Sequence, residues 1–240
     1  MRYLALLYGQ ESEEEADPTS QAFADEMSRY QRFEEFAGEA IVGGEALEPT
    51  SRAISLRFVG DDRVVTDGVL SEATEVIGGL FVLEAEDLDG AIEIARHLPA
   101  AEDGAVELRP LVDWYQNEAH RPDGSTRYLA LLRGTEPETM RPGTAAWEAA
   151  VEEHARFEKE EADAILGGGA LHPSDTGTVL RVRGGQPLLT EGSFAEVGEV
   201  IGGLYLLAAG DQQEIVRLAK GIPMGPPGII ELRPIVEMDG

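Results

Sequence analysis

Four side chains could carry acid–base chemistry, and they fall at two pairs of equivalent positions. His154 and Tyr30 each lie on the apolar face of an expected helix, where a polar head group needs a hydrogen-bond partner. Glu191 and Asp67 each follow an expected strand and are themselves followed by glycine. A carboxylate beside a histidine stabilises the charged imidazole and permits proton transfer near neutral pH. We therefore expect His154 and Glu191 to form an acid–base pair. Tyr30 and Asp67 would form its diverged counterpart.

The same residues also have a purely structural interpretation. A buried histidine or tyrosine with one hydrogen-bond partner is common in protein cores. An acid followed by glycine is also common in turns. Substitution of His154 by alanine separates the two interpretations, because a functional histidine is needed for ligand binding but not for folding.

Motifs that would indicate a metal, a cofactor or a covalent nucleophile are missing from the sequence. The four histidines, His97, His120, His154 and His172, are not spaced as metal ligands. The glycine pairs fit neither a dinucleotide-binding nor a phosphate-binding loop, and no Gly-x-Ser-x-Gly elbow occurs. We therefore expect neither a metal nor a cofactor.

Two arginines, Arg109 and Arg233, precede prolines in expected terminal strands. They could pair with neighbouring acids or receive an anionic ligand, and we favour pairing. Proline at these positions suggests an edge strand or a bulge.

The segments that would position these residues occur twice in the sequence, in the same order. This indicates a domain over residues 1–114, a second over 127–240, and a polar linker over 115–126 that contains a Pro-Asp-Gly turn. The repeated blocks are residues 3–7 and 128–132, 41–44 and 165–168, 75–80 and 199–204, and 107–110 and 231–234.

Each copy shows the same order of expected elements. In the first copy, apolar residues at helical spacing predict a helix that carries Phe23, Tyr30 and Phe33. The glycine pair at 43–44, like that at 167–168, is expected to allow a sharp exit from this helix. A second helix begins after the expected cap Asp87. Strands are expected at 2–8, 54–59, 63–66, 80–83 and 106–112, with a hairpin turn at 60–62.

This order predicts an α+β fold made of two tandem ferredoxin-like βαββαβ domains. Such a sheet has helices on one face only, so its other face must be covered. We expect the two sheets to cover each other in a pseudo-dimer resembling a dimeric α/β barrel. A monomeric pseudo-dimer and a true homodimer both remain open.

The segment VTDGVLSE at 65–72 resembles the TDGPF-x-E signature of the DGPF-motif branch of the YCII-related family. The copies depart from it at Val69-Leu70 and at Glu191-Gly-Ser-Phe194. The resemblance implies a fold similar to dimeric α/β-barrel proteins, which include small-molecule isomerases and oxygenases. It also implies an active site built on a proposed His–Asp pair in some members, and genes that often neighbour extracytoplasmic-function sigma factors.

The charge composition limits the classes of partner that the protein could bind. The net charge is −27, from 46 acidic and 19 basic residues, so phosphate backbones and anionic membranes would be repelled. We expect no nucleic-acid or membrane partner, and a surface that is either solubilising or suited to a basic protein. The chain has no cysteine, no apolar run of membrane-spanning length and an N-terminus that predicts a strand rather than a signal peptide. A cytoplasmic location is therefore expected.

Two functions from different classes fit these observations. The first is binding or proton-transfer chemistry on a small molecule in a pocket beside the His/carboxylate pair. The second is a non-catalytic regulatory or interaction role linked to sigma-factor signalling. A deep pocket that converges on His154 and Glu191 would favour the first, and a solid core there with an exposed apolar patch elsewhere would favour the second.

Overall fold

The computed structural model describes residues 1–17, 19–59, 62–70, 74–117, 121–137, 140–194 and 200–237. Within these residues the chain forms two compact units, each built on one antiparallel sheet. Residues 60 and 61 of the expected hairpin turn, residues 71 and 72 of the signature and His120 lie outside the described residues. No helix in the described part of the chain is both long and apolar enough to cross a membrane.

Unit 1 comprises residues 1–49, 71–111 and 175–194. Its sheet has the order β11-β10-β6-β1-β5-β2. Helices α2 and α3 pack on this sheet through Phe33, Ile92 and Ala95 against Tyr3 and Leu7. The elements are β1 (Arg2–Gly9), α1 (Glu13–Ala16), α2 (Gln21–Ala37), β2 (Ile41–Ala46), β5 (Val76–Glu84), α3 (Leu88–Ala95), α4 (Pro99–Asp103), β6 (Ala105–Pro110), β10 (Thr178–Arg183) and β11 (Gln186–Glu191).

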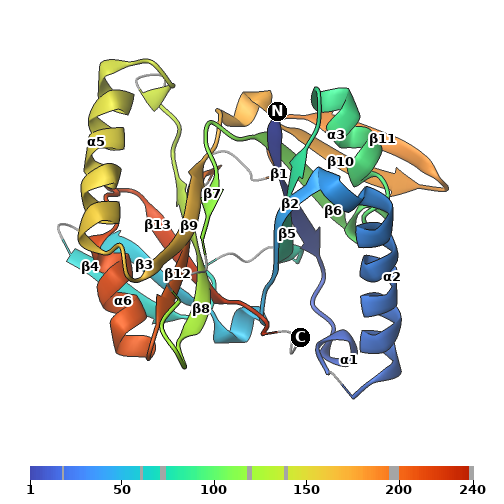
Figure 1. Ribbon diagram of the computed structural model, residues 1–240, viewed down its shortest axis with the longest axis horizontal. Coiled ribbons are helices and arrows are strands. Elements are labelled where there is room, and N and C mark those ends of the chain that lie inside the picture. Colours follow the sequence, from blue (N-terminus) through green and yellow to red (C-terminus); the bar gives the residue numbers. More distant parts are fainter. Residues whose placement is uncertain are drawn as a thin grey trace. The chain divides into compact units, whose positions relative to one another are not determined.

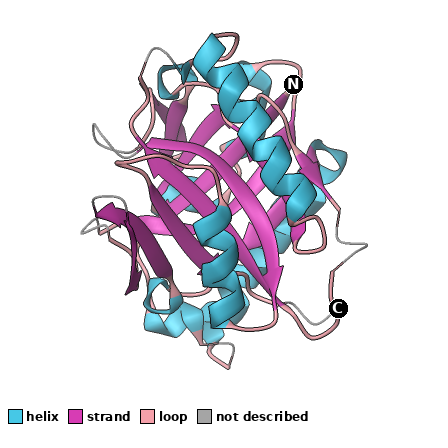
Figure 2. Cartoon of the chain, turned by 90° about the vertical axis from the view of Figure 1, so that its left-hand side faces the viewer, coloured by secondary structure: helices cyan, strands magenta, loops and turns pink. Residues whose placement is uncertain are grey.

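Unit 2 comprises residues 50–70, 112–174 and 195–240. Its sheet has the order β4-β3-β13-β8-β12-β9-β7. Helices α5 and α6 lie on the same face of this sheet (Figure 1), and the view from that side shows them in front of the strands (Figure 2). The elements are β3 (Ile54–Val59), β4 (Asp62–Asp67), β7 (Tyr115–Gln116), β8 (Thr126–Gly134), α5 (Ala145–Glu160), β9 (Ile165–Ala170), β12 (Val200–Ala209), α6 (Gln212–Gly221) and β13 (Ile229–Pro234).

The two sequence copies exchange their hairpins. Strand β3 of the first copy pairs with β13 of the second, and β10 of the second copy pairs with β6 of the first. A compact unit is therefore not the same as a sequence copy, because each unit contains the hairpin of the other copy. Strands β6 and β13, expected at sheet edges because of their prolines, are interior strands. The prolines are accommodated because Pro110 and Pro234 lie just beyond the residues that pair with the exchanged hairpins.

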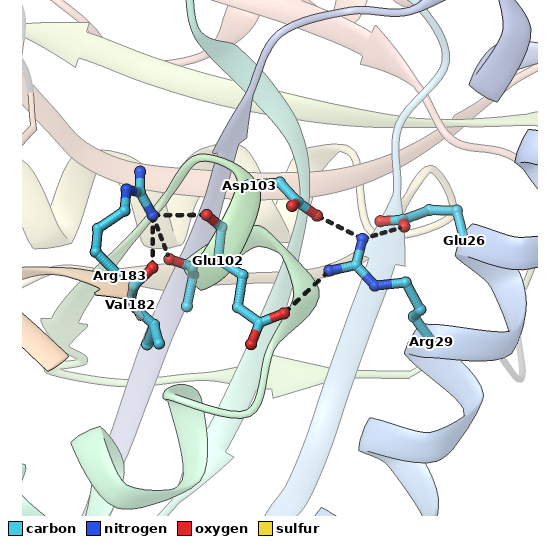
Figure 3. Close-up of polar contacts among 7 residues, drawn as sticks. Glu26, Arg29, Glu102, Asp103, Val182 and Arg183 are labelled. Atoms are coloured by element: carbon cyan, nitrogen blue, oxygen red, sulfur yellow. Dashed lines mark hydrogen bonds and ion pairs between the residues drawn. The ribbon is translucent and has the colours of Figure 1, made fainter. Parts of the chain in front are cut away.

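One arginine of each exchanged hairpin forms hydrogen bonds with the unit in which that hairpin lies. Arg183 of β10 donates to the carbonyl oxygens of Ala101, Glu102 and Gly104 at the C-terminal end of α4, over 2.6–3.1 Å, and Figure 3 shows the contact with Glu102. Arg63 of β4 does the same for α6, donating to the carbonyls of Ala219, Ile222 and Met224 over 2.7–3.0 Å. A cation at a helix C-terminus satisfies carbonyls that lack intrahelical partners.

The glycine pairs lie inside strands, which corrects the expectation that they end the preceding helices. Gly43 and Gly44 belong to β2, which pairs with β5. A Cβ at Gly44 would lie 2.8 Å from the ring of Phe81, so the pair permits close strand packing. The helix exit is instead made by Gly38, whose φ is +50°.

Candidate functional site

A cleft of about 1150 Å³ lies in unit 2 beside helix α5. Its walls come from α5, β9, β12 and the loop between α6 and β13, and Asp113 and Tyr115 also line it. His154 lies on this wall and Glu191 does not line this cleft, so the structure has a cleft beside His154 that does not also converge on Glu191.

Local sequence explains why α5 presents His154 to the cleft. Thr144 caps the helix by accepting a hydrogen bond from the Trp147 backbone N–H at 3.3 Å. Phe157 anchors the other end, because its ring is buried and packs edge-on against Tyr205. Val151, in the middle of the helix, is 45% exposed. Phe157 therefore holds the C-terminal half of the helix, and residues from both halves of α5, His154 among them, line the cleft.

His154 is tied to a carboxylate through a tyrosine. Its Nδ1 lies 2.8 Å from the Tyr205 hydroxyl oxygen, and that hydroxyl donates to Glu158 Oε1 over 3.2 Å. Tyr115 also donates to Glu158. Burial and the Glu158 charge raise the pKa of both phenols, so both stay protonated at neutral pH.

This arrangement selects one tautomer of the neutral imidazole. Tyr205 has one proton and gives it to Glu158, so its oxygen accepts from His154 Nδ1–H. The tautomer is assigned from the hydrogen-bond network. Nε2 is then the unprotonated nitrogen. Burial lowers the pKa of His154, and the charges of Glu153 and Asp113 oppose this only in part. His154 is therefore neutral near pH 7 and suited to accept a proton at Nε2.

The expected carboxylate partners lie elsewhere in the chain. His154 belongs to unit 2 and Glu191, in β11, to unit 1. Asp67, in β4, belongs to unit 2 and Tyr30, in α2, to unit 1. Within unit 2, the carboxylate connected to His154 is Glu158. The pairing of His154 with Glu191 stays a prediction, as does that of Tyr30 with Asp67.

The acid–glycine segments have a conformational role at the ends of the hairpins. Gly68 and Gly192 have φ of +85° and +95°, a region that favours glycine. Two residues later in the second copy, the Phe194 backbone N–H donates to the buried Glu107 carboxylate at 3.0 Å, and its ring stacks on Tyr8. Phe194, which aligns with the phenylalanine of the signature, thus anchors the exchanged hairpin to unit 1.

The equivalent region of the first copy is packed differently. Tyr30 occupies the position of His154 and faces Phe81, which occupies the position of Tyr205. The backbone N–H of Ala100, in α4, hydrogen-bonds Tyr30. In the described part of the second copy no helix corresponds to α4, and the chain between α6 and β13 borders the cleft instead.

Ion pairs hold α4 against α2 in unit 1. Arg29 of α2 pairs with Asp103 and with Glu102 of α4, as well as with Glu26 one turn before it (Figure 3). These contacts keep α4 over Tyr30. The first copy therefore has a tyrosine and a covering helix where the second has a histidine and a cleft.

Several residues of this site were missed by sequence reasoning. Glu158 is four residues after His154, a spacing that places both on one helix face and could have been noticed. Tyr205 lies in a strand expected only to be apolar. Tyr115 lies in the stretch expected to be a linker, but it forms strand β7 and pairs with Gly168 of β9.

The buried arginines pair with acids, as expected. Arg109 lies 3.2 Å from Glu107, and Arg233 lies 3.4 Å from Glu231. Among the described residues, no group of three or more histidine or acidic side chains is arranged to hold a metal ion.

Comparisons with known proteins identify a repeated family domain. The model of the YCII-related domain matches residues 1–115 and again residues 127–239. A curated relative, an uncharacterized protein of Rhizobium meliloti (strain 1021), is 36% identical over 67 residues, which are 27% of this chain and 54% of that protein. The chain thus spans about half the length of this relative. A crystal structure provisionally named as a chlorite dismutase has a TM-score of 0.40 and 10% identity, over 98% of this chain and 94% of that chain. At that TM-score the similarity adds nothing to the description of the site.

Proposed function

The chain belongs to the YCII-related family, and within it we propose that the second copy binds a small organic molecule in the α5 cleft and that His154 transfers a proton to or from it. The observation that carries this proposal is a neutral imidazole on the wall of a cleft of about 1150 Å³, held through Nδ1 by Tyr205. A base fixed at one nitrogen presents the other to a ligand in a defined direction. Isomerisation by proton transfer uses such a base and needs no cofactor.

The first copy serves as scaffold in this proposal. Burial raises the pKa of Tyr30, so its phenol stays protonated near neutral pH and cannot accept a proton, and α4 covers it. A duplicated chain can keep one site while the other copy stabilises the fold. The finer assignments stay part of the proposal: the DGPF-motif branch, ferredoxin-like copies arranged as a pseudo-dimer, and a cytoplasmic location.

Two carboxylates compete for the role of partner to His154, and substitution distinguishes them. If Glu158 sets the tautomer through Tyr205, Glu158→Gln weakens catalysis and Glu191→Gln does not. If Glu191 forms the acid–base pair, the effects are reversed. Asp67→Asn is the matched control for Glu191→Gln, because it changes the equivalent position of the other hairpin.

The test of the proposed function is solvent deuterium exchange at carbon acids. A panel of small ketones and 1,3-dicarbonyl compounds would be incubated with the protein in deuterated buffer and followed by proton NMR. We expect exchange above the buffer rate for at least one compound, and its loss in His154→Gln. Equal exchange by the wild type and this variant would contradict the proposal.

A second candidate function is protein interaction through an exposed sheet edge. Leu188 and Leu189 on the edge strand β11 are 54% and 53% exposed, and exposed strand edges can pair with another chain. This supports the alternative of a regulatory role beside a sigma factor. A complex with an extracytoplasmic-function sigma factor that survives His154→Gln but is lost on replacing both leucines with serine would favour it.

A further inference from the structure

The lining of the α5 cleft is mainly apolar and aromatic. Trp147, Tyr115 and Tyr205 supply rings, and Met140 and Met224 supply flexible apolar side chains. Aromatic walls favour ligands that are themselves flat and apolar over part of their surface. The wall is completed by prolines at positions 137, 142, 173, 223, 226 and 227.

The charges around the cleft disfavour an anion. Asp113, Glu136, Glu153, Glu158 and Glu160 contribute carboxylates to the lining, against arginines at 63, 141 and 156. These acids exceed the arginines, in a chain whose net charge is −27. Such a field lowers the local concentration of anions.

The lining arginines already have partners. Arg63 donates to the three carbonyl oxygens at the end of α6. Arg156 donates to the Glu152 carbonyl at 3.3 Å and pairs with Glu153 at 3.8 Å. An anionic ligand could pair with one of these arginines only by displacing the carbonyl oxygens or the carboxylate that the arginine already contacts.

The spacing of two lining residues on α5 sets a minimum length for the ligand. Trp147 and His154 are seven residues apart, so they lie on one face of the helix. At a rise of about 1.5 Å per residue, they are separated by roughly 10 Å along the axis. A rigid molecule that stacks on Trp147 and reaches His154 therefore needs at least two fused rings.

The sheet side of the cleft leaves room for a flat molecule. Gly202 of β12 lines the cleft, and a Cβ at this position would meet nothing within 4 Å. Gly78 occupies the same position in the first copy and also has open space around it. Both glycines lie at a register shift of the strand pairing, which makes Gly78 a matched control for changes at Gly202.

We infer, on the premise of the proposed function, that the ligand is an uncharged, flat, fused-ring ketone with an acidic C–H beside its carbonyl. The C–H bond breaks as its proton passes to His154 Nε2, and the electron pair moves onto the carbonyl oxygen to give an enolate. Return of a proton from His154 Nε2 to the same carbon restores the ketone and completes exchange, and where a C=C bond is conjugated with the enolate, return to its far carbon completes isomerisation. The step consumes no oxidant and needs no second substrate.

The test compares two compounds. One is 2-tetralone, an uncharged two-ring ketone, and the other is its 6-carboxylate, a negatively charged analogue with the same ring system. Binding is followed by quenching of Trp147 fluorescence, with Trp147→Phe to identify that emission. Turnover is followed by deuterium exchange at C1. We expect 2-tetralone to bind at least about tenfold more tightly than the carboxylate. Added salt should reduce the difference between the two affinities, because it screens the repulsion between the ligand's carboxylate and the acidic side chains of the cleft.

Variants separate failure of this inference from failure of the proposed function. Gly202→Leu should abolish binding of 2-tetralone, while Gly78→Leu should leave it intact. His154→Gln should bind 2-tetralone but lose exchange. Tighter binding of the carboxylate, or binding unaffected by Gly202→Leu, would overturn the ligand class. Binding without His154-dependent exchange would overturn the proposed function and leave the ligand class standing.

Discussion

A histidine buried in its neutral form makes the folded chain sensitive to acid. The pKa of His154 lies below its usual value of 6.5 because of burial, so between these two values the unfolded chain binds more protons than the folded one. The free energy of unfolding therefore falls as pH decreases from about 6.5 through the folded pKa, and this contribution is fully present above 6.5.

Substitution of His154 isolates this effect. We expect the free energy of unfolding of the wild type to lose more between pH 7 and pH 5 than that of His154→Gln, because glutamine does not titrate. Urea denaturation of both proteins at several pH values measures the difference, and contributions from other groups cancel. Parallel pH profiles would mean that His154 titrates freely and is not desolvated.

At the scale of secondary-structure elements, the guanidinium of Arg63 connects β4 to the end of α6. Its removal in Arg63→Met leaves three carbonyls without this donor, and we expect a loss of roughly 1–3 kcal/mol in the free energy of unfolding. Thermal or urea denaturation measures it. Arg57→Met, on the neighbouring strand β3, is the matched control, because the three carbonyl contacts at the end of α6 are made by Arg63. An equal loss in both variants would refute a specific role for Arg63.

The helices and most strands could be predicted from local pattern, but the site could not be completed from it. Helical spacing placed His154 on the apolar face of α5, and the short apolar run at 204–207 placed Tyr205 in a strand. Neither pattern states which strand lies under which helix, so the contact between His154 and Tyr205 was not accessible. The glycines at 43–44 look like a helix exit, yet they form a strand because packing against Phe81 requires the absence of a Cβ. Both the contact of His154 with Tyr205 and the strand at 43–44 depend on contacts between segments that are distant in the sequence.

At the scale of the whole molecule, hairpin exchange makes the copies depend on each other. Strand β6 of the first copy pairs with β10 of the second, and β13 of the second pairs with β3 of the first. Sequence repeats revealed the duplication but not this exchange, because strand pairing between distant segments leaves no local pattern. The two stretches of sequence are therefore not independent folding units.

Separate expression of residues 1–114 and 127–240 tests this dependence. We expect neither half to be a folded monomer, since each would lack the hairpin that completes its host sheet. Co-expressed halves should form a one-to-one complex, and a half expressed alone should exchange hairpins with a second copy of itself. Light scattering after size exclusion measures the mass. A monomeric half with a cooperative unfolding transition would contradict the exchange.

The tautomer of His154 tests the central claim most directly, and nitrogen-15 NMR of the labelled imidazole measures it. At a pH above the His154 pKa, the account predicts a protonated Nδ1 and an unprotonated Nε2, and a shift away from this tautomer in Tyr205→Phe. Protonation at Nε2 in the wild type, or a spectrum that Tyr205→Phe leaves unchanged, would contradict it.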